Sequence, residues 1–272
     1  MMLVDNEKCI GCTLCTQDCI VSDIEMRDGK AFIKNESCIS CGHCIAICPK
    51  NAVSTNHYDM NEVKEFDKDT FSITPENLMN FIKFRRSTRL FKNKEVENEK
   101  LEKILEAGRF TQTGSNMQDV SYVIVKDKLQ ELRKLVLETL NDLGNKLLTD
   151  SSTADYIKNY AKMWIKMYND FLENPNGEDK LFFKASALII VKSPSYVNGS
   201  LASSNMELMV NAIGLGTYFS GFLARAAAAN PKINEFLGLK EGENLVTCMV
   251  IGYPRVTYKR TVPRKEISVE WI

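Results

Sequence analysis

The cysteines are the residues of this chain whose types and spacing most directly imply chemistry. Eight of the nine form two copies of the pattern C-x2-C-x2-C-x3-C, with matching positions 29 residues apart (38 − 9 = 29). Three thiolates within seven residues can each bind a different iron of one [4Fe-4S] cube, while the fourth cysteine points away and binds the other cube. The spacing predicts one cluster on Cys9, Cys12, Cys15 and Cys48, and a second on Cys38, Cys41, Cys44 and Cys19.

Zinc and disulfides are the alternative uses of so many cysteines. Structural zinc prefers two C-x2-C hooks separated by a longer loop, because four ligands must converge on one ion, and a third cysteine so close does not fit. Disulfides need an oxidising compartment, and the N-terminus lacks an apolar leader. We therefore expect a cytoplasmic protein. Cys248 lies in the apolar run 245–251 and is expected to be a small core residue.

Size and composition set broad limits on the function. The chain has 272 residues, of which 44% are hydrophobic and 26% charged, with a formal net charge of zero. A neutral chain gives no general electrostatic reason to bind nucleic acid or a membrane surface. The longest apolar run, 185–191, is too short to span a bilayer. We expect neither a nucleic-acid nor a membrane partner.

The pattern along the chain predicts two domains joined by a polar segment. Residues 1–57 hold both cysteine motifs, 58–74 are a linker, and 75–272 form a larger domain. An Asp-Gly turn predicts a hairpin over 24–33. Helices outnumber strands in the larger domain without regular alternation, which indicates an α+β fold. We expect a first helix that begins at Pro75 and ends in the Arg-Arg-Ser segment 85–87, further helices over 97–109, 129–148, 154–172, 201–212, 221–229 and 233–237, and strands over 120–125, 185–191 and 245–251.

Residues 1–57 resemble the bacterial two-cluster ferredoxins. The two complete cysteine motifs and Pro49 after the second carry this resemblance. Ile20 departs from it, because the family usually has proline after the fourth cysteine of each motif. This difference removes no ligand.

Three separated segments could form a second chemical site. The segment 85–91 (RRSTRLF) holds three guanidinium groups, which suit a phosphate. The segment 113–118 (TGSNMQ) offers amides that can both donate to and accept from the edge of a ring. In the segment 214–222 (GLGTYFSGF), glycines let the backbone approach a ligand closely. No G-x-G-x-x-G dinucleotide pattern follows a predicted strand.

In this order and spacing, the three segments resemble the FMN-dependent nitroreductase family from about residue 75 to the C-terminus. The resemblance implies a mostly antiparallel central sheet flanked by helices, and a helix start at the G-L-G-T sequence. It also implies a set of FMN-binding residues. Arg85, Arg86 and Ser87 would hold the phosphate and ribityl chain, Arg89 would face the pyrimidine end, Asn116 with Gln118 would bind the ring edge, and Gly221 would present its backbone N–H to flavin N5 as the catalytic contact.

The resemblance also implies basic residues near the C-terminus that close on the phosphate, for which Arg260 and Arg264 are the first candidates. Family members are usually homodimers with FMN at the subunit interface, so the loop from Arg109 to Gln118 is expected to serve the partner's FMN. Some members have an acidic residue before the glycine at N5, where this chain has Ser220.

Together these features predict a flavin- and iron–sulfur-dependent oxidoreductase. Electrons would pass from reduced ferredoxin or NAD(P)H through two [4Fe-4S] clusters to FMN, and then to an electron-poor small molecule such as a nitroaromatic or an activated alkene. The alternatives are an electron-carrier module that serves a partner protein, and a reductive dehalogenase or ring reductase. The aromatic residues of 154–172 are expected either to form a substrate lid or to pack in the core. Tyr168, Tyr218 and solvent water are the candidate proton donors.

Overall fold

The structure is a computed structural model that describes all residues from Met1 to Ile272. The chain divides into two compact units. The first comprises Met1–Ile73 together with Thr113–Met117, and the second comprises Thr74–Gln112 and Gln118–Ile272. No helix is both long enough and apolar enough to cross a lipid bilayer.

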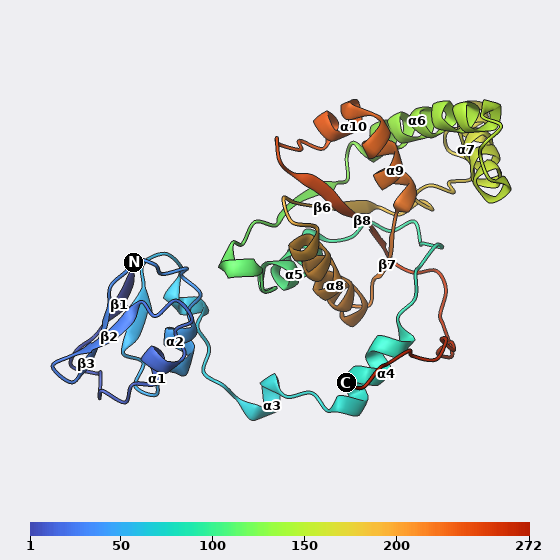
Figure 1. The fold of residues 1–272 in the computed structure, drawn as a ribbon. Helices are drawn as coiled ribbons and strands as arrows, with labels where there is room; N and C mark the ends of the chain where they lie inside the picture. The colour runs from blue at the N-terminus through green and yellow to red at the C-terminus, as the bar shows by residue number, and fades with distance from the viewer. The chain divides into compact units, whose positions relative to one another are not determined.

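The first unit is built from two small antiparallel ribbons and several short helices (Figure 1). The predicted hairpin is confirmed, with Ile24 paired to Ile33. At its turn, Asp28 and Gly29 have φ values of 49° and 76°, as a type I′ turn requires. The elements are β1 (Met2–Val4), α1 (Leu14–Gln17), β2 (Ile24–Arg27), β3 (Lys30–Ile33), α2 (His43–Ile47) and β4 (Val53–Thr55), with β1 paired to β4.

The sequence duplication is also a structural duplication. The residues before α1 and α2, Thr13 and Gly42, occupy equivalent motif positions (42 − 13 = 29), and both are left-handed, with φ values of 67° and 75°. Glycine adopts this conformation without strain, whereas threonine does so at a cost. Each motif therefore uses the same sharp entry into a short helix that carries its third cysteine.

The predicted linker contains two short helices within the first unit. They are η1 (Met60–Glu62) and α3 (Lys68–Phe71). Asp59 and Asp67 cap their N-termini by accepting hydrogen bonds from backbone N–H groups. Neither helix buries a residue, so side-chain caps rather than packing define these turns.

A four-stranded antiparallel sheet organises the second unit, in the order β5-β6-β8-β7. All seven residues of β6 are buried, which explains why its first five residues, Ala187 to Val191, are all apolar. The predicted strands near 120–125, 185–191 and 245–251 are confirmed, with bounds shifted by up to two residues. The strands are β5 (Ser121–Val125), β6 (Ala187–Ser193), β7 (Gly216–Phe219) and β8 (Asn244–Gly252).

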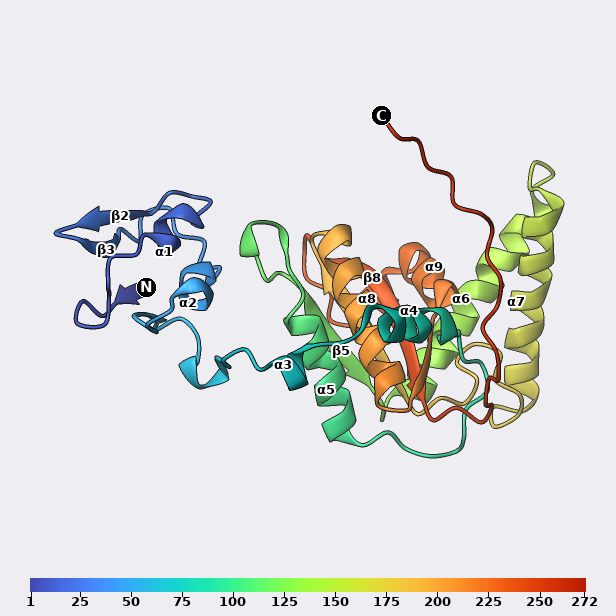
Figure 2. The ribbon, with the colours of Figure 1, turned by 90° about the horizontal axis from the view of Figure 1, so that it is seen from below.

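Helices cover both faces of this sheet (Figures 1 and 2). One apolar cluster joins Ile104 and Met206 to Ile189 of β6, and the other joins Leu137 and Trp164 to Ile190 on the opposite face. The first layer therefore contains α5 and α8, and the second contains the α6–α7 hairpin with α9 and α10. The helices are α4 (Pro75–Phe84), α5 (Asn98–Arg109), η2 (Gly114–Asn116, in the first unit), α6 (Leu129–Thr149), α7 (Asp155–Glu173), α8 (Tyr196–Ala212), α9 (Gly221–Ala229) and α10 (Pro231–Phe236).

Two predicted elements of the second unit were wrong in type or extent. The G-L-G-T sequence does not begin a helix: Gly216–Phe219 is the edge strand β7, because its residues pair with β8 from Gly216↔Gly252 to Phe219↔Met249. The helix predicted to begin at residue 201 instead begins at Tyr196, where the Ser195 side chain caps it by accepting from the Asn198 N–H at 3.2 Å.

Candidate functional site

The eight motif cysteines of the first unit surround two separate hollows. One hollow is lined by Cys9, Cys12, Cys15 and Cys48, together with Gly11 and Pro49 among others. The second is lined by Cys19, Cys38, Cys41 and Cys44, together with Gly42 and His43 among others. Each hollow therefore receives three cysteines from one motif and the fourth cysteine of the other motif.

Backbone amides donate to two of these sulfurs. The Ala31 N–H donates to Cys9 Sγ at 3.5 Å, and this hydrogen bond is the main reason that the pKa of Cys9 is lowered. The Ala52 N–H donates to Cys48 Sγ at 3.3 Å. Hydrogen bonds to a thiolate stabilise its charge and tune the potential of a cluster bound to it. The first hollow thus offers thiolate ligands supported by main-chain donors.

In the second hollow, ionisation of the Cys44 thiol is opposed by its surroundings. Burial, followed by the nearby thiolates of Cys41 and Cys38, raises the pKa of Cys44 to about 11. A site that gathers sulfurs in this way requires positive charge to hold them all deprotonated, and iron supplies it. No three Cys, His, Asp or Glu side chains converge on a point suited to one metal ion. Cluster ligands instead stand apart, because each binds a different iron, so the residues present fit a [4Fe-4S] cluster in each hollow.

In the second unit, the first and third candidate segments lie side by side. Ser87 forms a parallel bridge with Thr217 of β7, and the Thr88 N–H donates to the Thr217 carbonyl at 2.9 Å. This approach depends on Gly216, since a Cβ atom there would lie 2.6 Å from Thr88 Oγ1. The glycine that the sequence marked for close approach thus brings the arginine segment onto the sheet edge.

The arginine segment carries buried donors that lack acceptors. Arg85 forms an ion pair with Glu207 of α8, and the Arg86 guanidinium donates to the Arg85 carbonyl at 2.5 Å. Arg85 Nε and Arg86 Nη2 nevertheless remain buried without a partner. Such donors favour an anionic acceptor, and a phosphate offers several oxygens in the right planes. The residues therefore fit the FMN phosphate, and Glu207 is a neighbour that sequence reasoning missed, because nothing local links it to a site 122 residues away.

The third segment ends at a helix N-terminus. Ser220 is buried and caps α9 by accepting from the Leu223 N–H at 3.4 Å. Gly221 is the first residue of α9, so its N–H has no acceptor within the helix. A Cβ atom at Gly221 would meet nothing within 4 Å. The backbone at this position is therefore open to a ligand, and the helix N-terminus favours electron-rich acceptors there.

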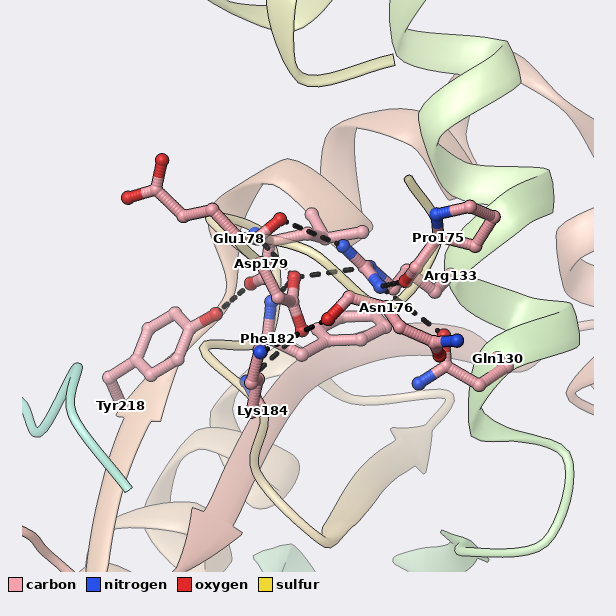
Figure 3. Close-up of polar contacts among 10 residues, drawn as sticks. Gln130, Arg133, Pro175, Asn176, Glu178, Asp179, Phe182, Lys184 and Tyr218 are labelled. Carbon is pink, nitrogen blue, oxygen red and sulfur yellow. Dashed lines mark hydrogen bonds and ion pairs between the residues drawn. The ribbon is translucent and has the colours of Figure 1, made fainter. Parts of the chain in front are cut away.

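A buried polar network anchors β7, the strand that precedes Gly221 (Figure 3). Arg133 Nε of α6 lies 3.2 Å from Asp179 Oδ1, and both side chains are at most 4% exposed. The Asp179 carboxylate also accepts from the N–H groups of Leu181 at 3.0 Å and Phe182 at 2.9 Å, which shapes the loop before β6. The Tyr218 hydroxyl of β7 donates to the Leu181 carbonyl. The loop thereby holds the end of β7, three residues before the start of α9.

The other flavin candidates lie in different surroundings. The Arg89 guanidinium stands 5.6 Å from the centre of the Tyr218 ring, a cation–π distance. Asn116 belongs to the first unit, where its amide donates to the carbonyls of Ile39 and Ser40, each at 3.0 Å. Gln118 belongs to the second unit.

The loop around Asn116 is conformationally strained. Ser115, Asn116 and Gln118 all have positive φ, between 49° and 54°. Non-glycine residues adopt this conformation at a cost, and such strain concentrates at ligand sites. The binding role of Asn116 and Gln118 stays a prediction.

The C-terminal candidates are exposed. Arg260 and Arg264 lie in the segment after β8 that has neither helix nor strand, and Arg264 contacts only the adjacent Pro263 carbonyl, at 3.5 Å. One contact does link this segment to the arginine segment, because the Tyr258 hydroxyl donates to the Ser87 carbonyl at 3.4 Å. Sequence reasoning missed this tyrosine, although it lies directly before the basic residues.

The aromatic residues of α7 belong to the core rather than to a substrate lid. Trp164, Met167 and Phe171 are at most 7% exposed and lie in the cluster between α6, α7 and the sheet. Tyr168 is partly buried against the same cluster. The lid alternative is therefore wrong for these side chains, since their helical spacing directs them inward.

Two further residues have roles in packing. Burial raises the pKa of Tyr218 far above its usual range, and its hydroxyl is already engaged, so this tyrosine is a poor proton donor. Cys248 is 1% exposed within β8, and burial raises its pKa strongly. The prediction that Cys248 is a core residue is confirmed.

Comparisons with known proteins agree with this geometry. The model of the nitroreductase family matches residues 82–253, and the model of a 4Fe-4S dicluster domain matches residues 1–49. The chain is 25% identical to an iodotyrosine deiodinase of Hydra vulgaris over 198 residues, which cover 69% of this chain and 70% of that protein. It is 25% identical to an NADPH-dependent oxidoreductase of Staphylococcus haemolyticus over 174 residues, covering 64% and 63%.

A solved structure is similar to the second unit in fold. It is a nitroreductase with bound FMN from Desulfitobacterium hafniense, with 24% identity, coverage of 73% of this chain and 100% of that chain, and a TM-score of 0.51.

Proposed function

Because the chain belongs to the nitroreductase family and carries a 4Fe-4S dicluster domain at its N-terminus, we propose that it reduces an electron-poor organic molecule with electrons that enter through two [4Fe-4S] clusters. The protein is an FMN-dependent oxidoreductase. Nitroaromatics and activated alkenes are the substrate classes that such a route serves, because both accept a hydride or an electron pair at an electron-poor atom.

The observation that carries the proposal is the grouping of the cysteines. Each hollow of the first unit is lined by four of them, which provides the ligands for one cluster in each. A ferredoxin-like unit with two clusters handles single electrons at low potential. The second unit of the same chain belongs to a flavin-binding family. One polypeptide thus combines a unit that accepts single electrons with a unit that carries out two-electron reduction.

The chain's own residues bind and orient the flavin in this proposal. When bound, FMN exchanges single electrons with the clusters and passes a hydride to the substrate. Arg85 and Arg86 bind the phosphate with the buried donors that now lack acceptors. Gly221 presents its N–H to flavin N5 at the open N-terminus of α9, and Ser220 keeps that turn in place by its cap. The substrate's proton comes from solvent water.

We further infer a homodimer in which each FMN touches both subunits. The helix α4 places Leu78, Met79 and Ile82 on the surface, and none of its residues is buried. An amphipathic helix without a buried face is stabilised when a second copy covers it. The strained loop at 113–118, with Asn116 and Gln118, would then serve the partner's flavin.

An anaerobic reduction experiment tests the electron route. Purified holoprotein is mixed with NADH, with NADPH or with a reduced low-potential ferredoxin, and flavin and cluster absorbance are followed separately. We expect the ferredoxin to reduce the clusters first and the flavin next, after which a nitroaromatic reoxidises both. Flavin bleaching by nicotinamide ahead of the clusters would refute the inward route.

One alternative is favoured by a specific finding. Similarity to an iodotyrosine deiodinase supports reductive dehalogenation on the same flavin site. Reoxidation of the reduced protein by a halogenated phenol, with stoichiometric halide release, would favour it over nitroreduction. If neither substrate class reoxidises the flavin, the chain instead relays electrons to a partner protein.

A further inference from the structure

A hollow of about 260 Å³ lies between α6, α7 and α9 in the second unit. Its apolar wall includes Leu147 of α6 and Ala228 of α9, and Trp164 of α7 also lines it. Ala228 lies in the last turn of α9, about 10 Å along the helix axis from Gly221. The hollow is therefore separate from the proposed flavin contact at the other end of this helix.

Two cations stand at the hollow without counter-charges. Lys146 and Arg225 line it, both are exposed, and neither side chain forms an ion pair or a hydrogen bond. No acidic side chain lines the hollow. The Arg225 guanidinium lies 5.6 Å from the centre of the Trp164 ring, so the aromatic face holds this charge at the site. The local field therefore favours an anion.

Trp164 is the aromatic residue that lines the hollow. Its side chain is 2% exposed, and Nε1 has no accessible surface, so a ligand in the hollow meets the ring rather than this N–H. The aromatic ring and the two free cations therefore lie at one small apolar hollow. The cations suit the charged group of an amphipathic anion, and the apolar wall suits its hydrocarbon chain.

We propose that the hollow binds an aliphatic monocarboxylate. The carboxylate is held by Arg225 and Lys146 beside the Trp164 ring, while the alkyl chain packs on Leu147 and Ala228. A volume of about 260 Å³ equals roughly nine water volumes, so a ligand of about ten non-hydrogen atoms, such as octanoate, fills it. This site does not depend on the identity of the flavin substrate.

Calorimetric titration of the holoprotein with octanoate tests the proposal. Trp164 and Trp271 are the only tryptophans, so Trp271→Phe leaves Trp164 as the sole fluorescence reporter of the same titration. We expect saturable binding, weakened roughly tenfold by Arg225→Gln and less by Lys146→Gln. Ala228→Leu, which fills the hollow, should abolish binding. Lys162→Gln removes an exposed cation of α7 that does not line the hollow and should change nothing.

Loss of binding can be distinguished from misfolding. Iron content, flavin content and circular dichroism identify any variant that fails to fold, and the three glutamine variants change only exposed side chains. Uncharged 1-octanol should bind at least tenfold more weakly than octanoate. Equal binding of octanol, equal affinity of Arg225→Gln, or the absence of saturable octanoate binding would each overturn the proposal, whatever the flavin site reduces.

Discussion

In the first unit, each hollow is lined by cysteines from two short motifs, whereas the second unit draws its flavin candidates from positions as far apart as Arg85 and Gly221. The units also differ in what holds them together. Three of the nine residues in the core of the first unit are cysteines that we assign to clusters. In the second unit, two apolar layers enclose a sheet without help from any ligand candidate of the flavin site.

The two sites should therefore respond differently to damage. Where cluster ligands form part of the core, losing a cluster removes folding free energy. Where the core is separate from the ligands, losing a ligand contact weakens binding and leaves the fold intact.

Cys48→Ser should have the largest effect, because it removes one thiolate from the hollow of Cys9, Cys12 and Cys15. We expect loss of that cluster and of hydrogen-exchange protection in β1 and β4, while β6 keeps its protection. Iron analysis and electron paramagnetic resonance of the reduced protein measure the cluster loss. The spectrum that remains should match that of Cys12→Ser. A match to Cys41→Ser would contradict the proposed grouping.

Asp179→Ala should cause the largest loss within the second unit. It leaves the Arg133 guanidinium buried without its counter-ion and frees the N–H groups of Leu181 and Phe182. Breaking a buried pair in this way costs about 3–5 kcal/mol. Urea denaturation followed by circular dichroism measures this change in the free energy of unfolding.

The exposed pair of Lys134 and Glu138 on the same helix is a matched control, with a distance of 3.8 Å. Glu138→Ala should cost less than about 1 kcal/mol. The double variant Arg133→Met/Asp179→Ala should recover part of the loss, since no charge then remains buried. A loss for Asp179→Ala no larger than for Glu138→Ala would show that the buried network does not hold the loop.

Arg85→Ala and Ser87→Ala should weaken flavin retention while iron content stays unchanged. A hydrogen bond to a charged group contributes about 1.5–3 kcal/mol, so Arg85→Ala should raise the dissociation constant of FMN by roughly tenfold to a hundredfold. Fluorescence of FMN released on dilution measures this constant. Lys83→Ala, at an exposed position in the last turn of α4, is the control. Unchanged flavin stoichiometry in Arg85→Ala would contradict the phosphate assignment.

The same contrast explains how far sequence reasoning reached. The cysteine pattern is local, so it predicted which residues to group before any fold was known. The apolar first five residues of β6 and the amphipathic helices α5, α6 and α7 were also predictable, since these patterns are a property of the chain itself.

What the sequence did not reveal depends on tertiary contacts. The glycines around Leu215 indicated a break, yet Gly216–Phe219 is a strand because β8 lies beside it. Glu207 gave no signal as the partner of Arg85, since the two meet only when α8 packs on the sheet. The sequence did not show the early start of α8, because Gly199 lies in its first turns and glycine is a poor helix former. Tertiary packing requires this glycine, since a Cβ atom there would lie 2.7 Å from Val246.

The smallest expected effect concerns Tyr122 of β5, whose hydroxyl is buried without a partner. Tyr122→Phe removes this unpaired group and should stabilise the second unit by about 1 kcal/mol at neutral pH.

Burial raises the pKa of Tyr122 from 10.0 to about 12. The folded state therefore holds the phenol proton more tightly than the unfolded state. Its contribution to the free energy of unfolding is complete below pH 10 and is lost as the pH rises to about 12. Denaturation curves across this range should fall more steeply for the wild type than for Tyr122→Phe. Tyr156→Phe, at an exposed position, should follow the wild type, and parallel curves for all three would show that Tyr122 ionises freely and that the second unit's core is less closed than the structure indicates.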